Sequence, residues 1–91
     1  MVFTFDFTER FEEVVRRLKR KDPQLALELN KKIKQIVQSN EETIEHYKNL
    51  NAPLSDYKRV HVGNFVLLFK IFKKENHVLF DKFAHHDDVY K

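Results

Sequence analysis

Apolar and polar residues follow two different periods along this chain, and the change from one to the other separates helices from strands. In "VFTFDF", residues 2–7, phenylalanine alternates with smaller or polar residues, which is the period of a half-buried strand. Apolar residues then recur every three or four positions over 11–18 and again over 25–37, which is typical of one helix face. The pattern therefore predicts a strand followed by two amphipathic helices.

Capping residues indicate where the helices begin. Thr8 offers an N-cap to the first helix, and Asp22-Pro23 forms a cap and first-position pair for the second. The join between them is so short that the helices must fold back on each other. A further helical segment is expected to restart at Ser39 or Asn40 and to end at "NAP", residues 51–53.

From Tyr57 onward the period changes to two, which predicts strands. Breaks at Gly63-Asn64 and at "KKEN", residues 73–76, divide this part into a meander of three strands. We see no internal repeat or linker, so residues 1–91 are expected to form a single domain. The order strand, helical hairpin, three-stranded meander predicts an α+β fold with a four-stranded, mostly antiparallel sheet.

The turn at Gly63-Asn64 fixes which side chains share a face of the sheet. A two-residue turn with glycine first suits type II′ and pairs Val62 with Phe65, and opposed residues point to the same side. One face is then apolar and is expected to lie beneath the helices: Val60, Val62, Phe65, Leu67, Phe69 and Ile71. The other face is mixed: Tyr57, Arg59, His61, Val66, Leu68 and Lys70.

The last strand can join either face, depending on the loop at "KKEN". A loop of even length adds Leu79, Asp81, Phe83 and His85 to the mixed face, whereas an odd loop reverses the strand. The mixed face has two interpretations at this stage. Its polar residues are either the ordinary outward side of a half-exposed sheet or a surface that binds something.

Composition narrows the classes of function. The 91 residues include no cysteine, which excludes disulfides, thiol chemistry and cysteine-ligated zinc. The longest apolar run, Phe65–Phe69, is far shorter than a bilayer span, and a cytoplasmic protein is expected. Five of the six residues from Arg16 to Lys21 are basic, which indicates an anionic partner or a helix end whose cations complement the macrodipole.

The C-terminal "HHDDVYK", residues 85–91, gathers histidines, acids and an aromatic residue. A metal site is disfavoured because the chain has no His-x-x-x-His helical pair and because four of these residues cluster in a single turn. A solvated polar tail is the plain alternative.

Three features together resemble a known family: the order of elements, the segment "LSDYKRVHVGNFVLLFKI" at 54–71, and the terminal "HHDDVYK". The sequence resembles the RelE superfamily of type II toxin–antitoxin modules, particularly its histidine-bearing, YafQ-like branch. The resemblance spans essentially the whole chain and is strongest over 54–90. It implies a RelE-like fold and a toxin that inhibits translation as a metal-independent, ribosome-dependent endoribonuclease, or mRNA interferase, cutting messenger RNA in the ribosomal A site.

The resemblance also implies roles for individual residues. Arg59 matches the basic strand residue that holds phosphate, and His61 matches the second member of that basic pair. His86 matches the histidine four residues before the terminal aromatic, and Tyr90 is that aromatic. His85 has no firm counterpart. No cofactor is implied.

The partners implied are the ribosome with its message and a cognate antitoxin. The antitoxin would cover the active face with an amphipathic helix or extended segment, or pack on the helical hairpin, and oligomers would form through it rather than through the toxin itself. Further contacts to ribosomal RNA phosphates are predicted at seven cations: Lys58, Lys70, Arg16, Arg17, Lys19, Arg20 and Lys21.

Two departures from the family pattern affect the mechanism. Val66 stands where many members have an arginine, and Phe69 stands where tyrosine is common. A mechanism based on arginine and lysine is therefore in doubt, whereas a histidine pair remains possible, and so does a weakened activity. The rivals are a ParE-like inhibitor of DNA gyrase, against which "HHDDVY" argues, and an inactive homologue that binds antitoxin and helps to repress its operon.

Overall fold

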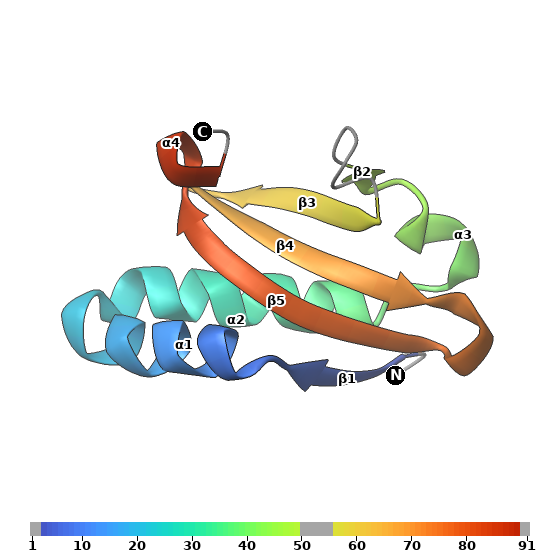
Figure 1. Ribbon diagram of the computed structural model, residues 1–91, viewed down its shortest axis with the longest axis horizontal. Coiled ribbons are helices and arrows are strands. Elements are labelled where there is room, and N and C mark those ends of the chain that lie inside the picture. The colour runs from blue at the N-terminus through green and yellow to red at the C-terminus, as the bar shows by residue number, and fades with distance from the viewer. Residues whose placement is uncertain (1–2, 50–55, 90–91) are drawn as a thin grey trace.

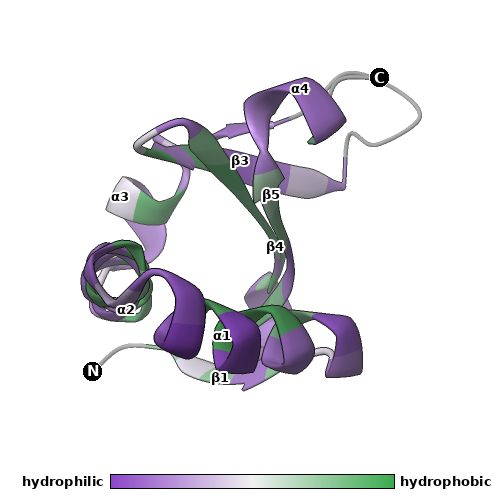
Figure 2. Ribbon diagram, turned by 90° about the vertical axis from the view of Figure 1, so that its left-hand side faces the viewer, coloured by the Kyte–Doolittle hydropathy of each residue, from purple (hydrophilic) through white to green (hydrophobic). Residues whose placement is uncertain are grey.

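The computed structural model describes residues 3–49 and 56–89, and it has the predicted order of elements with the strand β2, the turn η1 and the helix α4 added. α1 and α2 lie on one side of a five-stranded sheet, and α4 lies on the other side (Figures 1 and 2). The predicted α+β fold is confirmed. The elements are β1 (Thr4–Phe7), α1 (Glu9–Lys21), α2 (Pro23–Val37), α3 (Glu41–Ile44), β2 (Lys48–Asn49), β3 (Tyr57–Val62), β4 (Phe65–Phe72), the 3₁₀ turn η1 (Lys73–Glu75), β5 (His77–His85) and α4 (His86–Val89).

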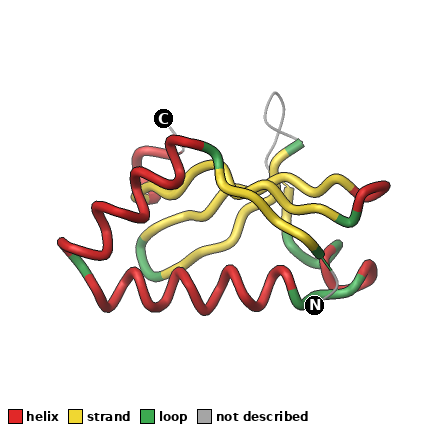
Figure 3. The backbone as a smooth tube through the Cα atoms, turned by 90° about the horizontal axis from the view of Figure 1, so that it is seen from below, coloured by secondary structure: helices red, strands yellow, loops and turns green. Residues whose placement is uncertain are grey.

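The helical hairpin begins at the predicted caps. The Thr8 side chain accepts a hydrogen bond from the Phe11 backbone N–H at 3.3 Å, and Asp22 Oδ1 accepts one from the Leu25 N–H at 3.2 Å. Pro23 follows as the first residue of α2. Figure 3 shows the short turn that joins the two helices and the way they fold back on each other.

The segment after α2 differs from the prediction. Asn40 caps α3 through a capping box with Thr43, but α3 is one turn long and ends at Ile44. Lys48–Asn49 then forms the short strand β2, which pairs with β3 and adds a fifth strand to the expected four. The predicted helix end at residues 51–53 lies outside the described residues.

The sheet has the order β1-β5-β4-β3-β2, in which β1 runs parallel to β5 and the other pairs are antiparallel. Gly63 has a φ of +61°, a conformation that glycine adopts without strain, and the hairpin pairs Val62 with Phe65 and His61 with Val66. Val62 is buried beneath the helices and His61 is exposed, so the predicted register is confirmed.

The apolar side of the sheet packs against the helical hairpin in one core. Side chains from helices and strands share it, and these are almost fully buried: Phe3, Phe11, Ile36, Leu67, Phe69, Val78 and Phe80. We call the opposite side the open face; β3 and β4 contribute Tyr57, Arg59, His61, Val66, Leu68 and Lys70 to it. No helix within residues 3–49 and 56–89 is long and apolar enough to cross a membrane.

A β-bulge in β5 changes the direction of its side chains. The loop before β5 has an even length, since Phe72 pairs with His77, and the strand starts in the predicted phase. Phe69 then pairs with Phe80 and Leu68 with Lys82, which leaves Asp81 as an extra residue.

Because of the bulge, the prediction of which β5 side chains lie on the open face is right before Lys82 and wrong after it. Leu79 and Asp81 belong to the open face as expected, but Phe83 and His85 pair with helix-facing residues of β4 and point toward the helices. Lys82 and Ala84 take their place on the open face. An unbroken period of two could not predict this reversal.

Candidate functional site

The end of β3 presents two of the predicted site residues side by side. Arg59 and His61 are two positions apart on one strand, so they share the open face. The Arg59 guanidinium lies 3.3 Å from His61 Nε2. Because arginine can only donate, this contact is a hydrogen bond in the tautomer whose Nε2 carries no proton.

The C-terminal turn α4 brings His86 to the same place. The His86 backbone N–H donates to the carbonyl of Asn64 in the hairpin turn at 2.9 Å. Val89, one turn later, packs against Val66 and Leu68, which form a small apolar cluster on the open face. These two attachments hold α4 over the end of the sheet.

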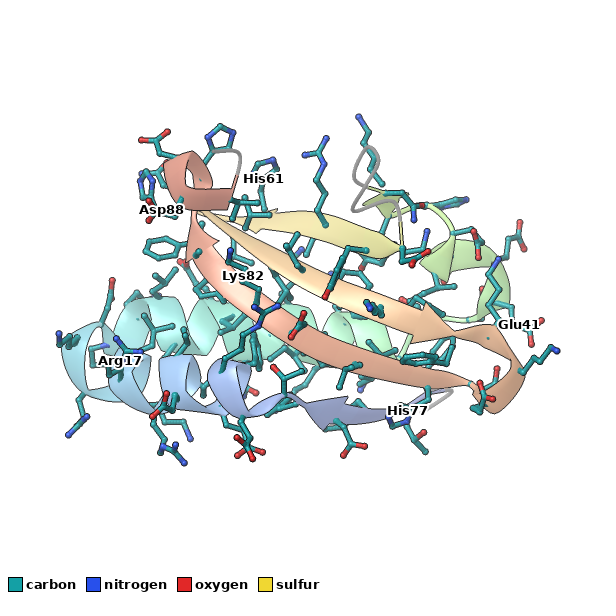
Figure 4. All side chains as sticks on the ribbon, in the orientation of Figure 1. Arg17, Glu41, His61, His77, Lys82 and Asp88 are labelled. Atoms are coloured by element: carbon teal, nitrogen blue, oxygen red, sulfur yellow. The ribbon has the colours of Figure 1, made fainter. Side chains whose placement is uncertain are left out.

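As a result, the two imidazoles that the sequence singled out lie together. The ring centroids of His61 and His86 are 5.8 Å apart, and the rings are inclined by 25°. Figure 4 shows His61 at the end of β3, next to α4. A basic and titratable pair with an arginine beside it thus forms from segments 25 positions apart in the chain. Tyr90 lies outside the described residues.

Asp87 is a polar neighbour of both tail histidines that the sequence did not single out for a role. Its carboxylate lies 3.6 Å from His86 Nδ1 and 3.7 Å from His85 Nδ1, and its backbone N–H donates to His85 Nδ1 at 3.3 Å. His85 itself points toward the helices, where its ring meets Phe65 edge-on.

Two further cations lie on the open face, and sequence reasoning missed both. Lys48 of β2 is directly opposite Arg59, and Lys82 of β5 is opposite Leu68, so these residues form a row across the sheet. Lys48 was missed because its segment has the pattern of a helix, and Lys82 because the bulge reverses its direction. Lys70, which was predicted, is partly buried with its ammonium 4.7 Å from the centroid of the Tyr57 ring.

The position of Lys58 argues against the RNA contact that the sequence predicts. Lys58 alternates with the open-face residues of β3 and is only 5% exposed. Its Nζ donates to the Tyr47 carbonyl and to Asn49 Oδ1, both at 3.1 Å, and lies 3.8 Å from Glu45. A hydrogen bond from Lys73 lowers the pKa of Glu45 below its usual value, so this carboxylate stays charged beside Lys58.

We therefore expect Lys58 to contribute to stability. Lys58→Gln should lower the free energy of unfolding by about 1–3 kcal/mol, because the buried Lys58 ammonium donates to the Tyr47 carbonyl and to Asn49 Oδ1 and these hydrogen bonds are lost. Chemical denaturation measures this change, and Lys74→Gln on the exposed turn η1 is the matched control. A variant that is as stable as the parent but binds ribosomes more weakly would show that Lys58 contacts RNA after all.

The basic end of α1 lies in the helical layer, apart from the histidine pair. Its five cations are all exposed: Arg16, Arg17, Lys19, Arg20 and Lys21. Figure 4 shows Arg17 at the hairpin end of the helices and His61 on the far side of the sheet. Any RNA that touches both must be large enough to pass around the domain.

Comparison with known proteins agrees with this architecture. A family described as the ParE toxin of the type II toxin-antitoxin system, parDE, matches residues 2–90. A putative toxin RelE4 of Methanocaldococcus jannaschii is 33% identical over 91 residues, which cover 99% of this chain and 93% of the relative.

Solved structures share the fold. YafQ from Escherichia coli matches with a TM-score of 0.74 at 13% identity, over 98% of this chain and 99% of the other. The intact Escherichia coli RelBE toxin-antitoxin complex contains a chain that matches with a TM-score of 0.69 at 17% identity, over 91% of this chain and 95% of the other.

The fold, the open face and these relatives define a toxin domain of the RelE superfamily. The chain belongs to the ParE toxin family of type II toxin–antitoxin systems, which here includes a relative named after RelE.

Proposed function

We propose that this toxin is a ribosome-dependent endoribonuclease that cleaves messenger RNA in the A site in the cytoplasm. The observation that carries the proposal is the pair of imidazoles, His61 and His86, stacked at 5.8 Å with Arg59 beside them. This combination supplies two groups that exchange protons near neutral pH and one fixed cation.

The chemistry of RNA cleavage needs these three groups. The ribose 2′-oxygen loses a proton as it attacks the adjacent phosphorus, and the departing 5′-oxygen gains one. An imidazole serves on either side at neutral pH, and each positioned acid or base contributes roughly 10²–10⁴ in rate. The Arg59 fork would bind the phosphate oxygens, on which negative charge builds up between the two proton transfers. Tyr90 would contact the substrate by stacking or by donating to the phosphate.

The row of cations on the open face would hold the RNA strand on both sides of the scissile phosphate. Lys48 and Lys82 flank Arg59 across the sheet, and Lys70 lies further along β4 on the same face. Phosphate contacts of this kind bind without regard to sequence and weaken with salt.

The function is tested by single-turnover cleavage of a message on programmed ribosomes. The parent toxin should cut the message in the A site, and it should do so in the presence of a chelator that removes transition metals but leaves the Mg²⁺ that the ribosome needs, because the proposed groups are all side chains. Intact message after prolonged incubation with excess toxin would refute the proposal.

A second function has an observation in its favour, because the matching family is described as the ParE toxin. A ParE-like toxin would inhibit DNA gyrase and would not need the histidine pair. Supercoiling by purified gyrase distinguishes the two: inhibition by the parent and equally by a His61→Ala, His86→Ala double variant would favour this alternative. A toxin inactive in both assays that still binds its antitoxin would be the inactive homologue.

The basic end of α1 would bind ribosomal RNA. Replacing Arg16, Arg17 and Arg20 by glutamine should weaken binding to ribosomes and lower the slope of log affinity against log salt, by up to about 0.9 for each phosphate that is no longer neutralised. Sedimentation at several salt concentrations measures this slope. Replacing Lys31, Lys32 and Lys34 on α2 by glutamine gives a control triple variant of equal charge. An unchanged slope in the α1 variant would mean that its cations do not bind ribosomal RNA and only complement the dipole of the helix end.

The partner proposed is an antitoxin, as in the solved RelBE complex. A groove of about 310 Å³ runs between α1 and α2, with Val15 and Ile33 among its apolar lining residues. Leu27, which also lines the groove, is 51% exposed. The apolar face of an antitoxin helix would fit this groove, and an extended segment would cover the open face.

A further inference from the structure

Asp81 is buried at the bulge of β5, and three residues hold it. Arg10 of α1 donates from Nε to Oδ1 at 3.0 Å and from its terminal nitrogen to Oδ2 at 2.5 Å. The Tyr57 hydroxyl at the start of β3 donates to Oδ2 at 2.5 Å. The Asp81 carbonyl accepts from the Thr8 hydroxyl at 3.1 Å and from Arg10 Nε at 3.2 Å. We call Thr8, Arg10, Tyr57 and Asp81 the Asp81 network.

The charges in this network keep its hydrogen bonds intact at neutral pH. Burial alone would raise the pKa of Asp81, but the hydrogen bonds from Arg10 and Tyr57 outweigh it and hold the pKa below its usual value. The hydrogen bond to Asp81 raises the pKa of Tyr57, so its hydroxyl remains a donor. A buried carboxylate with three charged or polar donors is held in one geometry.

The network holds the residue that is extra in β5. A bulge bends its strand and increases the local twist. Asp81 can be the extra residue because its carboxylate is matched by Arg10 and Tyr57. If the bulge fell at Lys82 or further along the strand, the Asp81 carboxylate would lose its contacts with Arg10 and Tyr57. The residues of β5 between the two bulge positions would also pair with different residues of β4.

The direction of β5 after the bulge decides where His86 lies. Only four residues, 82–85, separate Asp81 from the start of α4, and all four pair with β4. α4 has two further attachments, the backbone bond to Asn64 and the contact of Val89 with the apolar cluster. A short rigid strand therefore transmits the bend at Asp81 to the histidine pair.

We infer that Asp81, fixed by Arg10 and Tyr57, is a positioning residue that sets His86 against His61. The inference deepens the proposed function and rests on it for its catalytic consequence. Arg10 and Asp81 bond to each other, and Asp81 also bonds to Thr8 and Tyr57, so their proposed effect on the histidines passes through the strand. The network also attaches the first turn of α1 to the site from the opposite side of the sheet.

The test compares Asp81→Asn and Tyr57→Phe with Thr4→Val. Tyr57→Phe removes one donor and keeps the ion pair, which guards against a variant that fails to fold. Thr4→Val removes a side-chain contact of similar kind at the other end of β5, where Thr4 Oγ1 lies 2.6 Å from His77 Nδ1. Two quantities are measured: the ring-to-ring nuclear Overhauser effect between His61 and His86, and the single-turnover cleavage rate with ribosome affinity measured separately.

Asp81→Asn should weaken the ring-to-ring signal and lower the cleavage rate by about 10- to 100-fold, since a misplacement of about 1 Å has this effect. Ribosome affinity should stay within about twofold of the parent's, because the variant is expected to lose stabilisation of the transition state and not binding of the ribosome. Tyr57→Phe should show the same change to a smaller degree, and Thr4→Val should show neither.

The outcomes separate the inference from the proposed function. If the parent cleaves and both network variants cleave as fast with an unchanged ring-to-ring signal, the positioning role is wrong and the proposed function stands. If the parent cleaves nothing but Asp81→Asn loses the ring-to-ring signal, the positioning role stands and the proposed function is wrong. A rate that falls while the signal is unchanged overturns the positioning role as well.

Discussion

Replacing either His61 or His86 by alanine should lower single-turnover cleavage of ribosome-bound message by roughly 10²-fold or more. Each imidazole is proposed to transfer one of the two protons that the reaction moves, and their rings lie 5.8 Å apart, close enough to flank one phosphate. The double variant should lose less than the product of the two single losses, because groups that act as a unit are not additive. Quenched-flow cleavage with toxin in excess over programmed ribosomes gives the rates.

His46→Ala is the matched control, since this histidine is exposed and belongs to the segment between α3 and β2. Ribosome affinity should be unchanged in all three single variants. If His86→Ala cut as fast as the parent, the paired-histidine mechanism would be wrong. Cleavage would then have to depend on groups other than the histidine pair.

The register of the central hairpin could be predicted because it depends on local chemistry. Gly63 is the only glycine in the chain, and a two-residue turn with glycine first leaves one pairing for the strands on either side. The alternation of the flanking residues then decides which face is buried. Both pieces of information are contained within about fifteen consecutive residues, so His61 could be assigned to the open face before the structure was known.

The bulge could not be predicted in the same way, because its cause is tertiary. Asp81 is stabilised as the extra residue by Arg10 and Tyr57, which lie 71 and 24 positions away in the chain. An aspartate in an apolar strand is a weak signal of a bulge, since a charged residue there needs a partner. The partner itself cannot be read from the strand.

The burial of Lys58 has a similar origin. Along β3 it differs from Arg59 only by one position, yet it faces the core side, where β2 and the end of α3 supply its acceptors. The two-residue strand β2 has no period of its own. Its existence, and with it the position of Lys48 opposite Arg59, depends on pairing with β3.

The meeting of His61 and His86 was predicted from a family resemblance and not from periodicity. The structure adds the physical reason for it: Val89 packs against Val66 and Leu68, and this apolar contact docks the tail on the open face. Val66 stands at the position where the family resemblance implies an arginine. Its side chain is fully buried and packs against Val89 of α4. An apolar residue that holds α4, and with it His86, thus stands where the family resemblance implies a cation.

Restoring the family arginine with Val66→Arg should therefore lower activity rather than raise it. The position is 0% exposed beneath α4, so a guanidinium there must either be buried without a partner or push α4 away. We expect a loss of about 2–4 kcal/mol in the free energy of unfolding and a fall of at least about 10²-fold in cleavage as His86 leaves His61. Leu79→Arg, on the same face but away from α4, is the control and should leave cleavage close to that of the parent. A Val66→Arg variant that is as stable as the parent and cuts faster would contradict this expectation. It would show that the position of α4 does not depend on Val66 and that the open face supports an arginine-based mechanism.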